Sequence, residues 1–92
     1  MIGYVDATLT AENTFTNSMA IQDNLNYSVS GINGDTVTLQ RSFDNGTIWK
    51  DVVSVTEDTE GVYYETEMGV IYRLGIKTGG YSAGTVLVRV SF

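Results

Sequence analysis

Side chains alternate with a period of two along three segments of the chain, residues 36–43, 70–77 and 85–92. One phase of each segment holds, in turn, Val37, Leu39, Arg41 and Phe43; Val70, Tyr72, Leu74 and Ile76; and Val86, Val88, Val90 and Phe92. A period of two with β-branched and aromatic residues indicates strands that bury one face. The opposite phases carry Arg73, Lys77 and Arg89, and we expect these side chains to face water.

Further strands are predicted with weaker alternation, and helical periodicity is almost missing. They cover residues 4–9, 14–19, 25–31, 47–55 and 61–67. The segments between them are rich in Gly, Asn and Asp, which tolerate positive φ. About seven short strands in 92 residues favour an all-β fold, an antiparallel β-sandwich of immunoglobulin or fibronectin type III character. Two packed sheets bury the apolar side chains of both inner faces, whereas a single sheet would leave its apolar face in water.

The length of 92 residues fits a single domain, residues 1–92. Residues 1–22 are patterned less strongly than the rest. Two interpretations stay open for this segment. It is either an N-terminal arm that orders on a neighbouring subunit or a shell, or an ordinary pair of outer strands.

Composition excludes several classes of function. Cysteine and histidine are both absent, which removes disulfides, thiolate metal sites and the usual general base. The net charge is −6, and phosphate binding depends on clustered Lys and Arg, so no nucleic-acid partner is expected. No run approaches the roughly 18 apolar residues of a membrane span, and the start of the chain has no signal-peptide pattern, so no membrane partner is expected either.

An acidic stretch runs from Glu57 to Glu67 without a Lys or Arg. We interpret it as a solvated face, with a cation site or a patch for a basic partner as the alternative. Glu65 and Glu67 are expected on one strand face about 7 Å apart, a spacing that would suit glycoside hydrolysis. A sandwich this small offers no deep cleft around them. We therefore predict that the chain is not an enzyme, and we assign no catalytic residue, cofactor or metal ligand.

The octapeptide SFDNGTIW has the spacing Ser42, Asp44, Gly46 and Trp49. Asn45 and Gly46 both accept positive φ and form a strong short-turn dipeptide. Asp44 is expected to accept a hydrogen bond from the backbone amide two residues on, and Ser42 to do so more weakly. Trp49 has a large apolar face that would hold the turn against the sheet. All four residues thus have structural roles that need no substrate.

The same octapeptide resembles the Asp-box of the blade turns of sialidases and related propellers. In that family the box is a turn element away from the chemistry and is repeated around several blades. This chain has one copy and is too short for a propeller of at least about four four-stranded blades. The resemblance therefore implies a turn, and no sugar-processing site.

A longer resemblance covers roughly the last two thirds of the chain. The segments LNYSVSGINGDTVTLQRSFDNGTIWKDV and VIYRLGIKTGGYSAGTVLVRVSF are similar to a family of small β proteins encoded by tailed bacteriophages. That family combines a strand of the type TVTLQRSFDGG-x-x-W with a YRL strand and an SGTV-x-V-x-(L/V)S ending. The matching residues are 36–41, Asp44, Gly46, Trp49, 72–74 and 84–90. The resemblance implies a virion structural role, as a head decoration protein or the base of a head fibre.

The hypothesis that follows is a virion protein, made in the host cytoplasm, that binds the major capsid protein or another virion protein. Strand faces and tyrosines would form the contacts, with Tyr63, Tyr64 and Tyr81 as candidate interface residues. A homo-oligomer is expected, with a trimer as the guess because shells offer local three-fold sites. The alternative is an adhesion or carbohydrate-binding module of a phage appendage, in which Trp49, Tyr64 or Tyr81 stacks on a glycan.

Overall fold

A computed structural model describes residues 3–92, which form nine strands and no helix. The strands are β1 (Tyr4–Leu9), β2 (Thr14–Phe15), β3 (Met19–Ala20), β4 (Asp23–Ser30), β5 (Val37–Ser42), β6 (Lys50–Val55), β7 (Thr59–Glu65), β8 (Ile71–Ile76) and β9 (Val86–Ser91). The all-β fold that the alternation of side chains predicts is confirmed. Within the described residues there is no helix of the length and apolarity that a membrane crossing requires.

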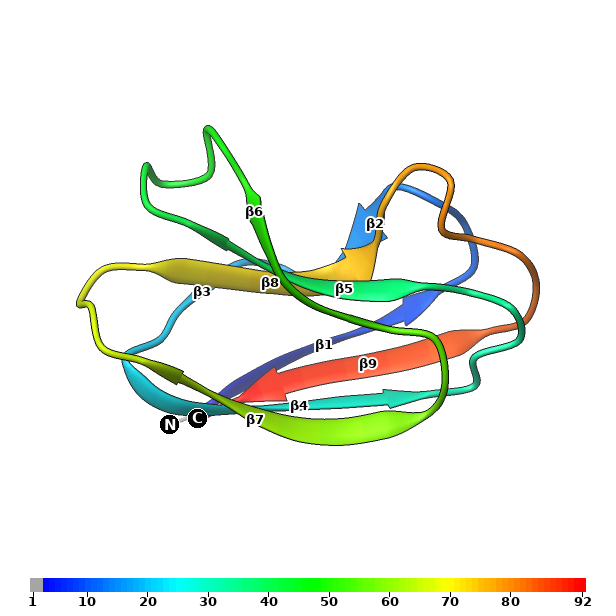
Figure 1. The fold of residues 1–92 in the computed structure, drawn as a ribbon, viewed down its shortest axis with the longest axis horizontal. Coiled ribbons are helices and arrows are strands. Elements are labelled where there is room, and N and C mark those ends of the chain that lie inside the picture. Colours follow the sequence, from blue (N-terminus) through cyan, green and yellow to red (C-terminus); the bar gives the residue numbers. More distant parts are fainter. Residues whose placement is uncertain (1–2) are drawn as a thin grey trace.

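The strands pair as a long antiparallel hairpin that folds over on itself. β5 pairs with β6, β4 with β7, β2 and β3 with β8, and β1 with β9. Two further ladders, β4 with β9 and β5 with β8, complete two sheets. Their strand orders are β1-β9-β4-β7 and β2-β8-β5-β6, with β3 also paired to β8. Figure 1 shows these sheets as the lower and upper layers of a sandwich.

This strand order is that of a jelly roll and departs from the expected immunoglobulin order. In an immunoglobulin domain the first and last strands belong to opposite sheets. Here β1 and β9 are neighbours in one sheet, and the chain crosses between the sheets at every connection except β2 to β3 and β5 to β6. The predicted antiparallel two-sheet sandwich is confirmed. The difference arises because alternation shows which face of a strand is buried, and leaves open which strands become neighbours.

The core lies between the sheets and uses the inward phases predicted from the sequence. Its buried residues are Leu9, Ile21, Leu25, Val29, Val37, Leu39, Val70, Tyr72, Leu74, Ile76, Val86, Val88 and Val90. Phe43 and Phe92 were expected on the same phases, but both are 56% exposed. The reason is that β5 ends at Ser42 and β9 at Ser91, so each phenylalanine lies one residue beyond its strand.

The N-terminal segment belongs to the sandwich. Within residues 1–22, β1 pairs with β9, and β2 and β3 pair with β8. This placement fits the interpretation as outer strands, with residues 1 and 2 outside the described part of the chain. The predicted strand over 14–19 is divided into β2 and β3, and the predicted strand over 47–55 begins only at Lys50.

Gly75 allows β2 to lie directly on β8. A Cβ atom at Gly75 would lie 2.5 Å from the Cα of Phe15 and would also collide with the carbonyl oxygen of Thr14. Both obstacles are backbone atoms, so neither can rotate away. Phe15 pairs with Gly75 in the ladder, and its ring stacks 3.8 Å from the Arg73 guanidinium carbon. Arg73 is therefore half-buried, although its phase was expected to be wet.

We predict that Gly75→Ala detaches β2 and lowers the free energy of unfolding by about 1–3 kcal/mol, because overpacking against backbone cannot relax locally. Urea denaturation of the variant and the parent protein measures the difference. Ser30→Ala, at an exposed position of β4, is the control and should change stability little. Equal stabilities for Gly75→Ala and the control would contradict the close contact.

Candidate functional site

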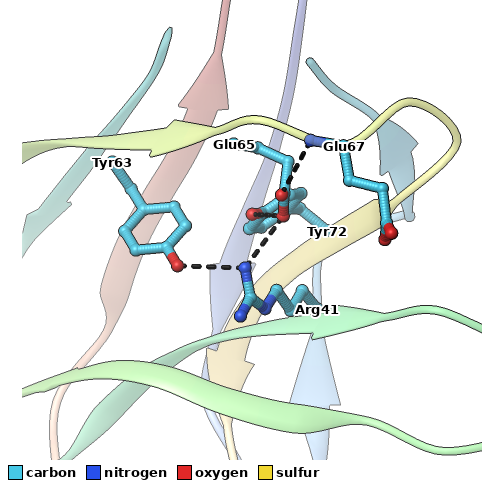
Figure 2. Close-up of polar contacts among 5 residues, drawn as sticks. All are labelled: Arg41, Tyr63, Glu65, Glu67 and Tyr72. Atoms are coloured by element: carbon cyan, nitrogen blue, oxygen red, sulfur yellow. Dashed lines mark hydrogen bonds and ion pairs between the residues drawn. The ribbon is translucent and has the colours of Figure 1, made fainter. Parts of the chain in front are cut away.

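Four side chains form a polar cluster between the two sheets (Figure 2). Arg41 on β5 and Tyr72 on β8 come from one sheet, and Tyr63 and Glu65 on β7 come from the other. Arg41 Nη1 donates to Glu65 Oε1 at 2.9 Å and to the Tyr63 hydroxyl at 3.0 Å. The Tyr72 hydroxyl donates to Glu65 Oε1 at 2.5 Å, and the Glu67 amide donates to Glu65 Oε2 at 3.1 Å. We call Arg41, Tyr63, Glu65 and Tyr72 the inter-sheet cluster.

The electrostatics of the inter-sheet cluster favour an ionised Glu65. The residue is only 3% exposed, and burial alone would raise the pKa of its carboxyl. Hydrogen bonds from Tyr72, the Glu67 amide and Arg41 outweigh burial, and the pKa of Glu65 lies below its ordinary value of 4.5. Burial, and then the bond to Glu65, raise the pKa of Tyr72. Both carboxylate oxygens thus accept hydrogen bonds, and Glu65 forms an ion pair with Arg41.

The inter-sheet cluster corrects the interpretation of the acidic stretch. Glu65 was expected on a solvated face, but it lies on the inward phase of β7. Glu67 lies beyond the end of β7, and Figure 2 shows its carboxylate pointing away from that of Glu65. The predicted pair of carboxylates on one strand face is therefore absent. A signal was present in the sequence: Arg41 shares a phase with Val37 and Leu39, and a guanidinium on a buried phase needs an ionised acceptor.

The octapeptide forms a closed turn between β5 and β6. Ser42 Oγ donates to Asp44 Oδ1 at 2.7 Å and accepts from the Gly46 amide at 2.8 Å. Asp44 Oδ1 accepts from the Ile48 amide at 2.9 Å, which is four residues on, and not two as expected. That bond, followed by the bond from Ser42, lowers the pKa of Asp44. Asn45 and Gly46 have φ of 59° and 93°, which only an Asn-Gly type of sequence accepts readily.

Trp49 lies in the loop before β6, where it covers the outer face of its sheet. Its ring is 4.3 Å from the guanidinium carbon of Arg73, which has Phe15 as its second aromatic neighbour. Arg73 Nε also donates to Gln40 Oε1 at 2.9 Å. The Trp49 ring is therefore occupied by contacts within the protein. Ser42, Asp44, Gly46 and Trp49 all contact the turn or the sheet that carries it.

The three candidate interface tyrosines have different surroundings. Tyr64 is 56% exposed on the outer face of the β1-β9-β4-β7 sheet. Tyr63 is half-buried and belongs to the inter-sheet cluster. Tyr81 is also half-buried, and its hydroxyl donates to the Gly84 carbonyl at 3.0 Å. Of the three, Tyr64 alone offers a free ring at the surface.

A second buried carboxylate ties the loops at the opposite end of the sandwich. Asp35 is 1% exposed. Its Oδ1 accepts from the amides of Ser82 at 2.6 Å and Ala83 at 3.0 Å, and its Oδ2 accepts from the amide of Asn33 at 3.0 Å. These amides, Asn33 first, hold the pKa of Asp35 below its ordinary value. Sequence reasoning missed this residue, because a single Asp in a Gly-rich loop has no periodicity to reveal burial.

The buried polar side chains within residues 3–92 are engaged in hydrogen bonds. No buried side-chain nitrogen or oxygen in this part of the chain lacks a hydrogen-bond partner. The same residues contain no group of three or more acidic side chains placed to hold a metal ion. Searches of protein-family models, of curated proteins and of solved structures find no match to this chain.

We predict that Glu65→Gln lowers the free energy of unfolding at neutral pH by about 1–3 kcal/mol, because it removes an ion pair that is only partly screened. The pKa of Glu65 is lower in the folded chain than its ordinary 4.5. The contribution of Glu65 to the free energy of unfolding is therefore present above about pH 4.5 and is lost as the pH falls below that value. Denaturant titrations from about pH 7 to about pH 3 should show a smaller decline in the variant. An identical decline in both proteins would contradict the ionised cluster.

We predict that Asp44→Ala loosens the turn, because the Ile48 amide and the Ser42 hydroxyl lose their acceptor. The melting temperature should fall by a few degrees while the β-type circular dichroism spectrum is kept. Ser42→Ala should have a similar effect, since it removes the partner of the Gly46 amide. Thr47→Ala, in the same loop with an exposed side chain, is the control. A variant of Asp44 as stable as this control would show that the octapeptide has no structural role.

Proposed function

We propose that this chain is a non-catalytic structural protein of a bacteriophage virion that decorates or cements the capsid surface. The observation that supports it most is the distribution of exposed apolar side chains. Six large ones gather at the end of the sandwich that holds the β5–β6 loop, the β7–β8 turn and the last residue: Tyr4, Phe43, Ile48, Tyr64, Met68 and Phe92. We call this end the turn end, on the left in Figure 1. Exposed apolar groups that gather in one region favour a partner surface.

The registers of both sheets place these residues at the same end. Ser42, just before Phe43, pairs with Ile71, which follows the β7–β8 turn. In the other sheet, Tyr4 pairs with Ser91, next to Phe92. The inter-sheet cluster joins the two sheets at this end.

The turn end is held rigid before any partner binds. The guanidinium carbon of Arg41 lies 4.9 Å from the centre of the Phe43 ring. The Ser42 and Asp44 hydrogen bonds fix the loop that carries Ile48. A preorganised loop loses little conformational freedom on binding, so more of the contact energy remains as affinity. A capsid lattice is a partner of this kind, because its surface is preformed and repeats identically.

We predict that Phe43→Ser combined with Ile48→Ser reduces binding to capsid shells at least tenfold, because together they remove two exposed apolar contacts. Shells assembled from the major capsid protein of the same genome are mixed with the protein and sedimented. Leu87→Ser is the matched control, since Leu87 is 52% exposed but lies at the opposite end of the sandwich.

Three outcomes have distinct meanings. Loss of binding for the turn-end variant alone supports the proposal. Equal binding by both variants would show that the turn end does not contact the capsid. If the parent protein stays in the supernatant with shells and with whole virions, it does not bind the capsid, and the proposed decoration role is wrong.

The alternative is a carbohydrate-binding module, and one observation favours it. The outer face of the β1-β9-β4-β7 sheet has an open hollow whose lining is about equally polar and apolar, and Val62 in it shares a face of β7 with the exposed Tyr64. The residues that line it are Asn26, Tyr27, Ser28, Glu60, Gly61, Val62, Arg89 and Ser91. Arg89 stacks on Tyr4 at 4.6 Å and could donate to sugar hydroxyls or carboxylates. A glycan array tests this: a signal that is lost in Arg89→Ala would replace the leading proposal, and an empty array would exclude the alternative.

A further inference from the structure

The edge strands of the two sheets differ in how well they are protected from pairing with another chain. In the β2-β8-β5-β6 sheet, one edge is divided into two strands of two residues, and the ladder to the other edge strand, β6, shifts register between Leu39 and Gln40. Short edge strands and bulges are devices that prevent pairing with another chain. In the β1-β9-β4-β7 sheet, both edge ladders are continuous, over six residue pairs at β1 and seven at β7.

β7 is the less protected of the two continuous edges. Like β1, it contains no Lys or Pro, which commonly block edges, and its inward charge, Glu65, is neutralised by Arg41. Its outer face carries Val62 and Tyr64, which are 63% and 56% exposed. The exposed residues of β1 are Tyr4, Asp6 and Thr8, so that edge has a more polar outer face than β7. β7 thus offers a row of unpaired backbone groups beside an apolar strip, at the margin of the lower layer in Figure 1.

We propose that β7 pairs antiparallel with β7 of a second copy of this chain, so that two sheets join across a two-fold axis. A two-fold contact uses the same surface on both copies, so each free edge is satisfied by the other. This proposal specifies the homo-oligomer expected from the sequence and replaces the guessed trimer with a dimer. It deepens the proposed virion function but needs no capsid for its test.

The acidic residues limit the registers available for this pairing to two, with the axis at Tyr63 or at Tyr64. A two-fold axis at Tyr63 places no acidic residue directly opposite another across residues 57–69, whereas an axis at Val62 would oppose Glu57 to Glu67. The opposed pairs in the Tyr63 register are Val62 with Tyr64, Gly61 with Glu65, Glu60 with Thr66, Thr59 with Glu67, Asp58 with Met68 and Glu57 with Gly69. Like charges directly opposite each other destabilise a ladder, so a chain of net charge −6 favours the two registers that avoid them. The axis at Tyr63 pairs residues 61–65 of β7, whereas the axis at Tyr64 pairs only residues 63–65, so we take the Tyr63 register.

The Tyr63 register makes a prediction that general electrostatics does not. It sets residue 62 of one copy against residue 64 of the other, twice in each dimer. Val62→Lys with Tyr64→Lys therefore opposes two lysines at each contact, and we expect dimerisation to weaken about tenfold or more. Val62→Lys with Tyr64→Glu opposes a lysine to a glutamate at each contact, and we expect the dimer to persist.

Nonspecific repulsion predicts the reverse order for the two variants. The two lysines reduce the negative charge of the chain, so they should favour association if the charge as a whole controlled it. With an axis at Val62, the Lys–Glu variant would bring the two introduced lysines of the dimer directly opposite each other and would dissociate as well. The pair of variants therefore tests both the edge and the register.

Sedimentation velocity over a range of protein concentrations, at physiological salt, measures the association of each protein. Thr8→Lys, exposed on the other edge strand, is the matched control and should dimerise like the parent. Circular dichroism verifies that every variant is folded, which is expected because all three positions are exposed.

The expected result is a parent dimer that the Lys–Lys variant alone loses. A parent protein that stays monomeric at the highest concentration overturns the proposal, as does equal dimerisation of the Lys–Lys and Lys–Glu variants. A Thr8→Lys variant that dissociates would move the interface to β1. None of these outcomes depends on capsid binding, so the virion proposal would stand or fall separately.

Discussion

The ion pair between Arg41 and Glu65 is the interaction on which the turn end depends. It joins the two sheets through charged groups, while the middle of the sandwich is filled by apolar side chains. Its carboxylate also accepts from Tyr72 and from the amide of Glu67. One buried charge thereby positions the end of β7, the start of β8 and the turn between them. Without its partners, a carboxylate as buried as this would destabilise the fold.

The interior and the surface of this protein therefore have different roles. The interior polar groups, Glu65 at one end and Asp35 at the other, hold loops to strands through hydrogen bonds. The surface keeps the apolar side chains of the turn end and the free edge of β7. Both are suited to contacts with preformed protein surfaces. A small sandwich with rigid ends and an open edge is a reasonable building unit for an assembly such as a virion, which is what we propose for this chain.

Much of the fold could be predicted from the sequence, and the reasons for the failures are physical. Alternation identifies the inward residues of β5, β8 and β9, since a period of two over six to eight residues is characteristic of a strand with one buried face. The strand order cannot be found in this way, because any strand with a buried face fits either sheet. The phase predicts Phe43 inside, but β5 ends before it. Pattern alone does not mark the residue at which a ladder stops.

The sites were predicted less well than the fold. The octapeptide is recognisable as a turn because its residues act locally, through bonds such as that from Ser42 to Asp44. Glu65 was missed because four other acidic residues in the same stretch suggested a solvated face, although Arg41 on a buried phase required a partner. Such a partner lies 24 residues away in the chain, and only the folded arrangement of sheets brings the two together. Pairing at a distance of this kind is where sequence reasoning needs the structure.

A double-mutant cycle on Arg41 and Glu65 tests the central claim most directly. The free energy of unfolding is measured for the parent protein, Arg41→Met, Glu65→Gln and the double variant at neutral pH. Each single substitution should lower the free energy of unfolding by about 1–3 kcal/mol. The double variant should lose less than the sum of the two, with a coupling energy of about 1–2 kcal/mol. Additive effects, with a coupling energy near zero, would show that the ion pair does not hold the two sheets together.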